Sequence, residues 1–120
     1  MAHGEMNHIE FPADDPERAK AFYGAVAGWE FGEMEGFPDY HMFRTSEGYG
    51  GAIGKRDVST GHTVRIYIEV NSIEDALAAS SRTGGTTKEP KTEIPGMGWF
   101  AVVTDPEGSE VGLFKSSRAG

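Results

Sequence analysis

The sequence predicts an α+β fold in which a βαβββ module occurs twice in tandem. The first observation is the order of the expected elements, which is a strand, a helix and three strands in each half of the chain. The second is a sparse match between the halves at an offset of 57 residues, which places Ile9 opposite Ile66 and Gly28 opposite Gly85. Two such modules, each with its helix on one sheet face, would form a curved mixed sheet around a concave cup.

A polar linker separates the two modules. Residues 56–63, RDVSTGHT, show no hydrophobic pattern and lie between a first module at about 7–55 and a second at about 64–115. Residues 1–5 carry no motif and are expected to form a loose leader. We treat residues 1–120 as one domain, since a chain of this length suffices for two small modules that share one core.

The first module should open with a strand at residues 8–13, where polar and apolar residues roughly alternate. A helix should follow, because Asp15 can cap its first turn and Pro16 needs no hydrogen bond at the first helical position. Gly28 should end this helix. The apolar residues that recur at helical spacing are Ala19, Phe22, Tyr23 and Val26. Three short strands are then expected at residues 29–34, 40–45 and 49–55.

The second module should open with the most regular strand of the chain, residues 64–70, in which aliphatic and polar residues alternate. Ser72 should cap the next helix, with Asp75 three residues later completing a pair that resembles a capping box. Gly84 and Gly85 should stop that helix. Three strands are expected at residues 86–89, 98–104 and 110–115, with a turn at 105–108.

The composition excludes several classes of function. The chain has a net charge of −8, so it would repel a nucleic-acid backbone or an anionic membrane surface. It has no cysteine, which excludes disulfides, thiolate metal sites and a cysteine nucleophile. No apolar run approaches the ~20 residues of a membrane span, and the start is no signal peptide. We therefore expect a cytoplasmic protein.

The alternation of the strands indicates which side chains line the cup. His8 and Glu10 share one face of the first strand. In the strand at 64–70, Arg65, Tyr67 and Glu69 share one face, while the aliphatic residues share the other and should meet the helices. We expect the polar face to line the cup.

Aromatic residues should complete the wall of this cup. In the last strand Val111 and Leu113 should pack under the helices, which leaves Phe114 toward the cup. The pattern does not fix which face the other strands present. The further candidates for the wall are therefore Tyr40, Met42 and Trp99.

The polar cup residues have two interpretations. Buried charges require partners, so Arg65 should pair with Glu10 or Glu69, and His8 could bridge them. The group would then be a polar anchor for a ligand in an aromatic-walled pocket, or His8 and Glu10 would perform acid–base catalysis. Alternatively, it is a self-satisfied ion pair that holds the modules together.

The other histidines are weaker candidates. His3 lies in the leader, and His62 lies in the linker, where solvent should surround it. His41 lies within a strand and is best explained as a structural residue, although a metal site built from His8, Glu10 and His41 stays open. The glycine-rich stretch 50–54 lacks the lysine of a phosphate loop and should permit close backbone approach or a dimer contact.

Two segments resemble the vicinal oxygen chelate superfamily, which contains glyoxalase I, bleomycin-resistance proteins and extradiol dioxygenases. These are residues 8–31, HIEFPADDPERAKAFYGAVAGWEF, and residues 94–114, IPGMGWFAVVTDPEGSEVGLF. The resemblance covers nearly the whole chain and implies the fold more safely than any reaction. It also implies a homodimer, since members of the family commonly pair.

The resemblance further implies a divalent metal held by histidine and glutamate from four strands. The matching positions in this chain are His8, Ala52, Arg65 and Gly112, of which only His8 is a ligand type. Arginine has no lone pair to offer a metal. One protein ligand does not make a stable site, so we expect no metal and no other cofactor.

Three functions follow from these expectations. The first is a glyoxalase-like, bleomycin-resistance-like protein that binds a small molecule, partly aromatic or cationic, without the family metal. The alternative is a lyase, isomerase or dioxygenase-type enzyme with a rearranged metal site, or with a metal-free acid–base mechanism that uses His8 and Glu10. The third is a non-catalytic interaction module.

Overall fold

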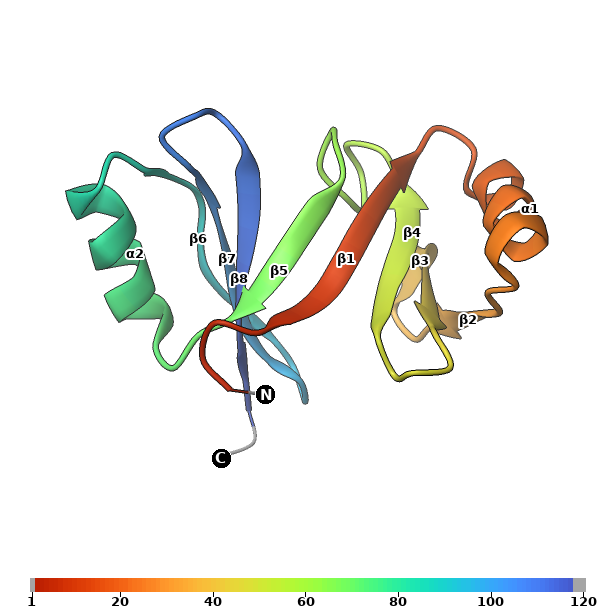
Figure 1. Cartoon of the computed structure of the whole chain (residues 1–120), viewed down its shortest axis with the longest axis horizontal. Helices are drawn as coiled ribbons and strands as arrows, with labels where there is room; N and C mark the ends of the chain where they lie inside the picture. The colour runs from red at the N-terminus through yellow and green to blue at the C-terminus, as the bar shows by residue number, and fades with distance from the viewer. Residues whose placement is uncertain (1, 118–120) are drawn as a thin grey trace. The chain divides into compact units, whose positions relative to one another are not determined.

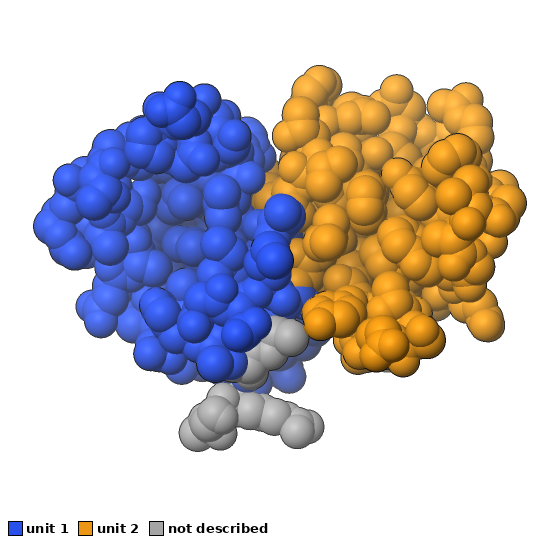
Figure 2. Space-filling model, in the orientation of Figure 1, with its two compact units in different colours: residues 1–7, 66–120 blue, residues 8–65 orange. Residues whose placement is uncertain are grey.

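The computed structural model describes residues 2–117, which form two compact units (Figure 2). Residues 8–65, orange in Figure 2, are called the first module below. Residues 2–7 together with residues 66–117, blue in Figure 2, are called the second module. Arg65 thus belongs to the first module, and the N-terminal segment belongs to the second.

The described residues form two helices and eight strands in the predicted order (Figure 1). The elements that open in the first half of the chain are β1 (Met6–Ala13), α1 (Pro16–Ala27), β2 (Phe31–Met34), β3 (Phe37–Arg44) and β4 (Gly50–Lys55). Those of the second half are β5 (Arg65–Glu69), α2 (Ile73–Arg82), β6 (Thr86–Ile94), β7 (Gly98–Thr104) and β8 (Glu110–Ser116). Within residues 2–117, neither helix is long and apolar enough to cross a membrane.

The two modules share one strand topology. In the first module β1 pairs in parallel with β4, and β3 and β2 follow in antiparallel order. In the second module β5 pairs in parallel with β8, and β7 and β6 follow in antiparallel order. This repetition confirms the predicted α+β fold of two tandem βαβββ modules with mixed sheets. The concave cup stays a prediction.

Both helices begin where the sequence predicts. The Asp15 carboxylate accepts a hydrogen bond from the backbone N–H of Arg18, and the Ser72 hydroxyl accepts one from the backbone N–H of Asp75. Gly28 ends α1 with a φ of +75°, a left-handed conformation that favours glycine.

An aromatic cluster joins α1 to the sheet of the first module. Tyr23 of α1 stacks on Trp29 at a ring distance of 5.3 Å, and Trp29 stacks on Phe43 of β3 at 4.1 Å. Phe11 of β1 contacts all three rings. Trp29 therefore packs between helix and strands, as a residue after the helix stop should.

The predicted apolar stripe of α1 is only partly used. None of the twelve described residues of this helix is buried, and Phe22 and Val26 are 57% and 69% exposed. The expectation that both face the sheet is wrong, because the helix meets the sheet mainly through Tyr23.

The second module has an aliphatic core beneath α2, which lies against β6, β7 and β8 (Figure 1). Its buried members are Val70, Ile73, Ala101, Val103 and Leu113. Its partly buried members are Ile68, Ala76, Leu77, Trp99 and Val111. The predicted helix-facing residues of β8 are thus confirmed. Of the aliphatic face of β5, Ile68 joins the core and Ile66 stays 39% exposed.

The N-terminal leader is not loose in its described part. The Gly4 N–H donates to the Glu69 carbonyl, and the Glu69 N–H donates to the Glu5 carbonyl, each at 2.8 Å. The Nδ1 atom of His3 accepts from the Asn71 N–H at 3.0 Å. These bonds tie the segment to the end of β5; Met1 lies outside the described residues.

Candidate functional site

The first module presents a polar sheet face on the side opposite α1. Phe43 of β3 packs into the aromatic cluster under α1, so its neighbours at alternate positions, Tyr40 and Met42, point to the other side. Tyr40 meets His8 and Glu10 of β1 there. This placement resolves the orientation that the sequence pattern left open for Tyr40 and Met42.

Tyr40 links the two candidate catalytic residues. Its hydroxyl donates a hydrogen bond to the Oε2 atom of Glu10 at 2.7 Å, and its oxygen lies 2.7 Å from the Nε2 atom of His8. Because the single phenolic proton is directed at Glu10, the hydroxyl oxygen of Tyr40 must accept a hydrogen bond from the Nε2–H group of His8. This arrangement assigns the neutral His8 ring the tautomer that is protonated at Nε2.

A buried ion pair holds the carboxylate of Glu10. The Nη1 atom of Arg65 lies 3.6 Å from Oε1 of Glu10, and each side chain is only 5% exposed. The guanidinium compensates the negative charge that Glu10 would otherwise bring into the interior. The expected pairing of Arg65 with Glu10 is therefore confirmed.

Burial keeps His8 neutral. Desolvation lowers the pKa of His8 to about 4, because the surroundings disfavour the charged ring. At neutral pH the group consisting of His8, Tyr40, Glu10 and Arg65 thus carries one positive and one negative charge. We call these four residues the polar network.

Glycine makes room for Tyr40 in this network. Tyr40 lies opposite Gly54 across β3 and β4. A Cβ at Gly54 would lie 3.1 Å from the ring of Tyr40 and 2.7 Å from the methyl group of Thr60. Gly51, in the same stretch, lies so close to the Ile9 carbonyl that no side chain fits there. The predicted close backbone approach at residues 50–54 is confirmed.

The second module repeats the combination of tyrosine and glycine. Tyr67 of β5 lies opposite Gly112 of β8, and its ring covers the space that a Cβ at Gly112 would need. Glu69 accepts hydrogen bonds from Nδ2 of Asn7 at 2.9 Å and from the N–H of Ser116 at 3.1 Å. Phe114 is half-buried opposite Glu69. Ligand contact by Tyr67, Glu69 and Phe114 stays a prediction.

Trp99 lies elsewhere in this module. It packs against the aliphatic core that α2 covers, and Nζ of Lys91 lies 5.3 Å from its ring. Its neighbours at alternate positions, Ala101 and Val103, belong to the same core. The structure therefore gives Trp99 a packing role, and it is left out of the proposed site.

His41 does not join His8 and Glu10. Its position next to Tyr40 turns it toward α1, where Nε2 lies 4.0 Å from Glu17 and Nδ1 lies 3.6 Å from Glu33. A metal site built from His8, Glu10 and His41 is thus wrong. Within residues 2–117, no three histidine or acidic side chains lie together in a way that could hold a metal ion.

Comparison with known proteins identifies the family. The sequence profile of the glyoxalase-like domain matches residues 8–114, which is most of the chain. This chain belongs to the glyoxalase-like domain family. With it, the resemblance to the vicinal oxygen chelate superfamily is confirmed.

Curated relatives of this glyoxalase-like chain carry similar names. It is 28% identical over 115 residues to CFP32 of Mycobacterium bovis, which is provisionally named a glyoxylase. That match covers 93% of this chain and 44% of the relative, so the chain spans less than half of the relative's length. A glyoxylase-like domain-containing protein of Didymella fabae is 29% identical and is covered to 91% on both sides.

Solved structures share the glyoxalase fold. A superfamily member from Vibrio splendidus superposes with a TM-score of 0.68 at 16% identity, covering 90% of this chain and 96% of the other. Methylmalonyl-CoA epimerase of Streptomyces coelicolor superposes with a TM-score of 0.67 at 16% identity, covering 98% and 100%. At this level of identity the likeness establishes the fold alone.

The residues at the family's metal positions do not fit a metal. Arg65 points its guanidinium at Glu10, and guanidinium has no lone pair to donate. Ala52 offers no ligand atom and is fully buried. Gly112 lies beneath the ring of Tyr67, which occupies the space that a ligating side chain would need. His8 is the one ligand type among the four positions, so we derive no step through a metal.

Proposed function

We propose that this chain is a small-molecule-binding, bleomycin-resistance-like member of the glyoxalase-like family that works without the family's metal. The polar network would be its anchor for the ligand. The observation that carries this proposal is the buried Arg65–Glu10 pair, which Tyr40 connects to a neutral His8. These four side chains come from three strands, β1, β3 and β5, and their polar groups meet, as the few fixed polar groups of a binding site do.

The chemistry of the network suggests the class of ligand. The charges of Arg65 and Glu10 balance, so the network should bind a ligand that donates and accepts hydrogen bonds better than it binds a strongly acidic one. Tyr40 and Met42 add aromatic and polarisable surface to the same face. Since the whole chain carries a charge of −8, a partly aromatic ligand with a neutral or cationic polar group is favoured.

A thermal-shift screen tests this proposal. We expect at least one compound of a broad library, antibiotics included, to raise the melting temperature of the wild type. Tyr40→Phe should reduce that shift because it removes the hydroxyl that joins His8 to Glu10. Tyr49→Phe, at an exposed position, is the matched control and should leave the shift unchanged. A library without a stabilising compound would count against the proposal.

The absence of a metal is tested separately. We expect the protein to bind less than about a tenth of an equivalent of Mn, Fe, Co, Ni or Zn in equilibrium dialysis followed by elemental analysis. A stoichiometric metal that is lost in His8→Ala would overturn the metal-free reading and move an enzyme mechanism to first place.

A second candidate is a metal-free acid–base enzyme of the lyase, isomerase or dioxygenase type. It is favoured by the neutral ring of His8, whose Nδ1 atom carries no proton in the tautomer assigned above and lies on the same network as the carboxylate of Glu10. The names of relatives, a glyoxylase and an epimerase, fit such chemistry. This candidate expects His8→Ala and Glu10→Gln to abolish a turnover that belongs to the purified protein. Turnover that survives in both variants would exclude these roles.

We further propose a cytoplasmic homodimer that has no nucleic-acid or membrane partner. The acidic charge and the family resemblance support this proposal. Analytical ultracentrifugation should give about twice the chain mass of 13.0 kDa. A monomer at micromolar concentration would contradict it.

A further inference from the structure

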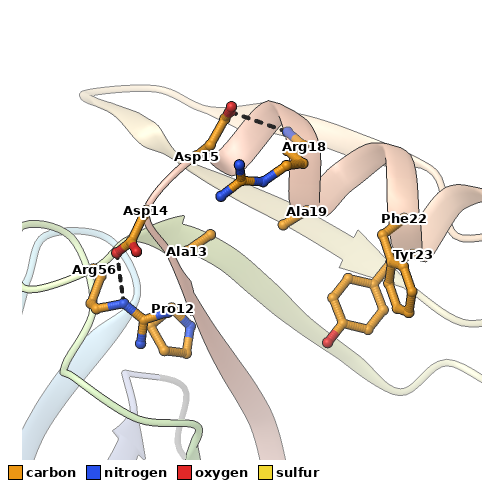
Figure 3. A pocket seen from close by; sticks show the side chains of 9 residues that line it. All are labelled: Pro12, Ala13, Asp14, Asp15, Arg18, Ala19, Phe22, Tyr23 and Arg56. Carbon is orange, nitrogen blue, oxygen red and sulfur yellow. Dashed lines mark hydrogen bonds and ion pairs between the residues drawn. The ribbon is translucent and has the colours of Figure 1, made fainter.

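A pocket lies in the first module, away from the polar network. It is an open surface pocket of about 410 Å³ between the end of β1, the first turns of α1 and the residue that follows β4 (Figure 3). Arg18 and Arg56 line one part of it, and Phe22 and Tyr23 line another. None of the polar-network residues lines it, so its occupant need not be the ligand of the proposed function.

The acidic residues at this cavity are already engaged. Nε of Arg56 donates to Oδ1 of Asp14 at 2.8 Å (Figure 3), and this hydrogen bond is the main cause that lowers the pKa of Asp14. The Asp15 carboxylate caps α1 through the backbone N–H of Arg18. Nη1 of Arg56 also donates to the carbonyl of His62 at 2.5 Å. Both carboxylates therefore have partners, and Arg56 is held in place.

The guanidinium of Arg18 is the other cation at this pocket. It makes no hydrogen bond or ion pair with any residue between 2 and 117, although the chain is strongly acidic. In Figure 3 it turns back toward the turn that carries Asp14 and Asp15, on the side where Arg56 lies. Two guanidinium groups and two carboxylates thus border this pocket, so its charges balance, and Arg18, which attracts Asp14 only at longer range, is the cation without a direct partner among residues 2–117.

The opposite part of the cavity is aromatic. Phe22 is 57% exposed and meets Tyr23 edge-on at 5.0 Å, while Tyr23 stacks on Trp29. This stacking fixes the ring of Tyr23. Its hydroxyl points away from α1 in Figure 3 and makes no hydrogen bond to the described residues. A ligand can therefore meet an apolar ring and a hydroxyl group opposite the arginines.

We propose that this cavity is a binding site for a small aromatic carboxylate. The carboxylate would meet the guanidinium of Arg18, which offers two parallel N–H donors, and Arg56 would add charge. The ring would lie against Phe22, with the hydroxyl of Tyr23 available to a polar substituent. The proposal goes beyond the proposed function, since it assigns another ligand class to another place.

Titration with benzoate, followed by two-dimensional NMR of the ¹⁵N-labelled protein, tests this site. We expect saturable, millimolar binding, an affinity on the order of what a ligand of this size attains, with the largest shifts at α1 and at the end of β1. Benzamide, which has the same shape without the charge, should bind roughly tenfold more weakly. Equal shifts from both compounds would overturn the proposal.

Arginine variants separate a site from general charge attraction. Arg18→Gln should weaken benzoate binding by roughly fivefold or more, because it removes the free guanidinium. Arg82→Gln, which changes the net charge equally at an exposed position of α2, is the matched control and should bind benzoate as the wild type does. Equal weakening in both variants, or wild-type binding by Arg18→Gln, would exclude the site.

A third variant keeps this test distinct from that of the proposed function. Tyr40→Phe alters the polar network and should leave the benzoate titration unchanged, because Tyr40 does not line this cavity. Loss of benzoate binding in Tyr40→Phe together with normal binding in Arg18→Gln would place the carboxylate at the polar network and overturn the second site.

Discussion

The two modules share a topology but use it differently. In the second module, α2 buries Ile73 in an aliphatic core. In the first module, α1 buries none of its twelve described residues and meets the sheet through the stacked rings of Tyr23, Trp29 and Phe43. The first module also holds the polar network on its other sheet face.

This difference indicates a division of roles. Aliphatic burial stabilises a fold without offering chemistry, and the second module has more of it beneath its helix. The first module combines a lightly packed helix, a buried ion pair and a cavity with two arginines. Such groups cost stability and are found at functional sites. We therefore expect substitutions in the two modules to fail in different ways.

The largest effect should come from removing one member of the ion pair. Arg65→Met leaves the buried carboxylate of Glu10 without its guanidinium and should lower the free energy of unfolding by about 3–5 kcal/mol. Urea denaturation measures this loss. The double variant Glu10→Leu/Arg65→Met should recover part of it, because no charge then stays buried. A loss below about 1 kcal/mol in the single variant would show that the pair is not desolvated.

The contrast between the helices should appear in a matched pair of truncations. Ile73→Ala removes a fully buried side chain and should cost about 3 kcal/mol through lost burial and the cavity left behind. Val26→Ala truncates a residue that is 69% exposed on α1 and should change stability by less than about 0.5 kcal/mol. Chemical denaturation of both variants compares them. Similar losses would mean that α1 packs as α2 does.

Acid should weaken the first module through His8. Its pKa is lowered from 6.5 to about 4 by burial, so between these values the unfolded chain binds a proton that the folded chain does not. Stability should therefore fall by about 2–3 kcal/mol as the pH drops from 6.5 to 4, and it should not change on this account above 6.5.

A non-titrating variant isolates this contribution. His8→Gln keeps an N–H donor for Tyr40 and should lose the fall between pH 6.5 and 4. The acidic residues with lowered pKa values, Asp14 and Glu74, lose their stabilising charge only as the pH falls through those lowered values. If His8→Gln lost as much stability between pH 6.5 and 4 as the wild type does, the loss could not be assigned to His8.

The sequence predicted the local features of this fold well. Asp15 with Pro16, and Ser72 with Asp75, start helices where expected, because capping depends on neighbouring residues. The face of a strand was predicted where aliphatic and polar residues alternate, as at Ile68. Such signals need no knowledge of the rest of the chain.

Features that depend on distant partners were missed. The hydrogen bonds between the leader and Glu69 join residues that lie far apart in the sequence. The exposure of Val26 depends on which part of α1 the sheet covers. A local sequence pattern encodes neither feature. The sequence analysis also missed that Tyr40 bridges His8 and Glu10. Strand alternation offered a signal, because it places Tyr40 on the face opposite Phe43. Packing of Phe43 against Trp29 would have fixed the orientation of that strand.

The smallest effect should distinguish the two pairs of tyrosine and glycine. Gly112→Ala places a methyl group against the ring of Tyr67 and should cost about 2 kcal/mol, whereas Gly54→Ala should cost less because its nearest neighbour is the methyl group of the Thr60 side chain. Thermal and urea denaturation of both variants measure the difference. Adding Tyr67→Ala should make Gly112→Ala nearly neutral, since the clash then disappears. If Gly112→Ala were neutral by itself, the ring of Tyr67 would be free to move aside, and the close contact between this ring and Gly112 would not constrain the residue at position 112.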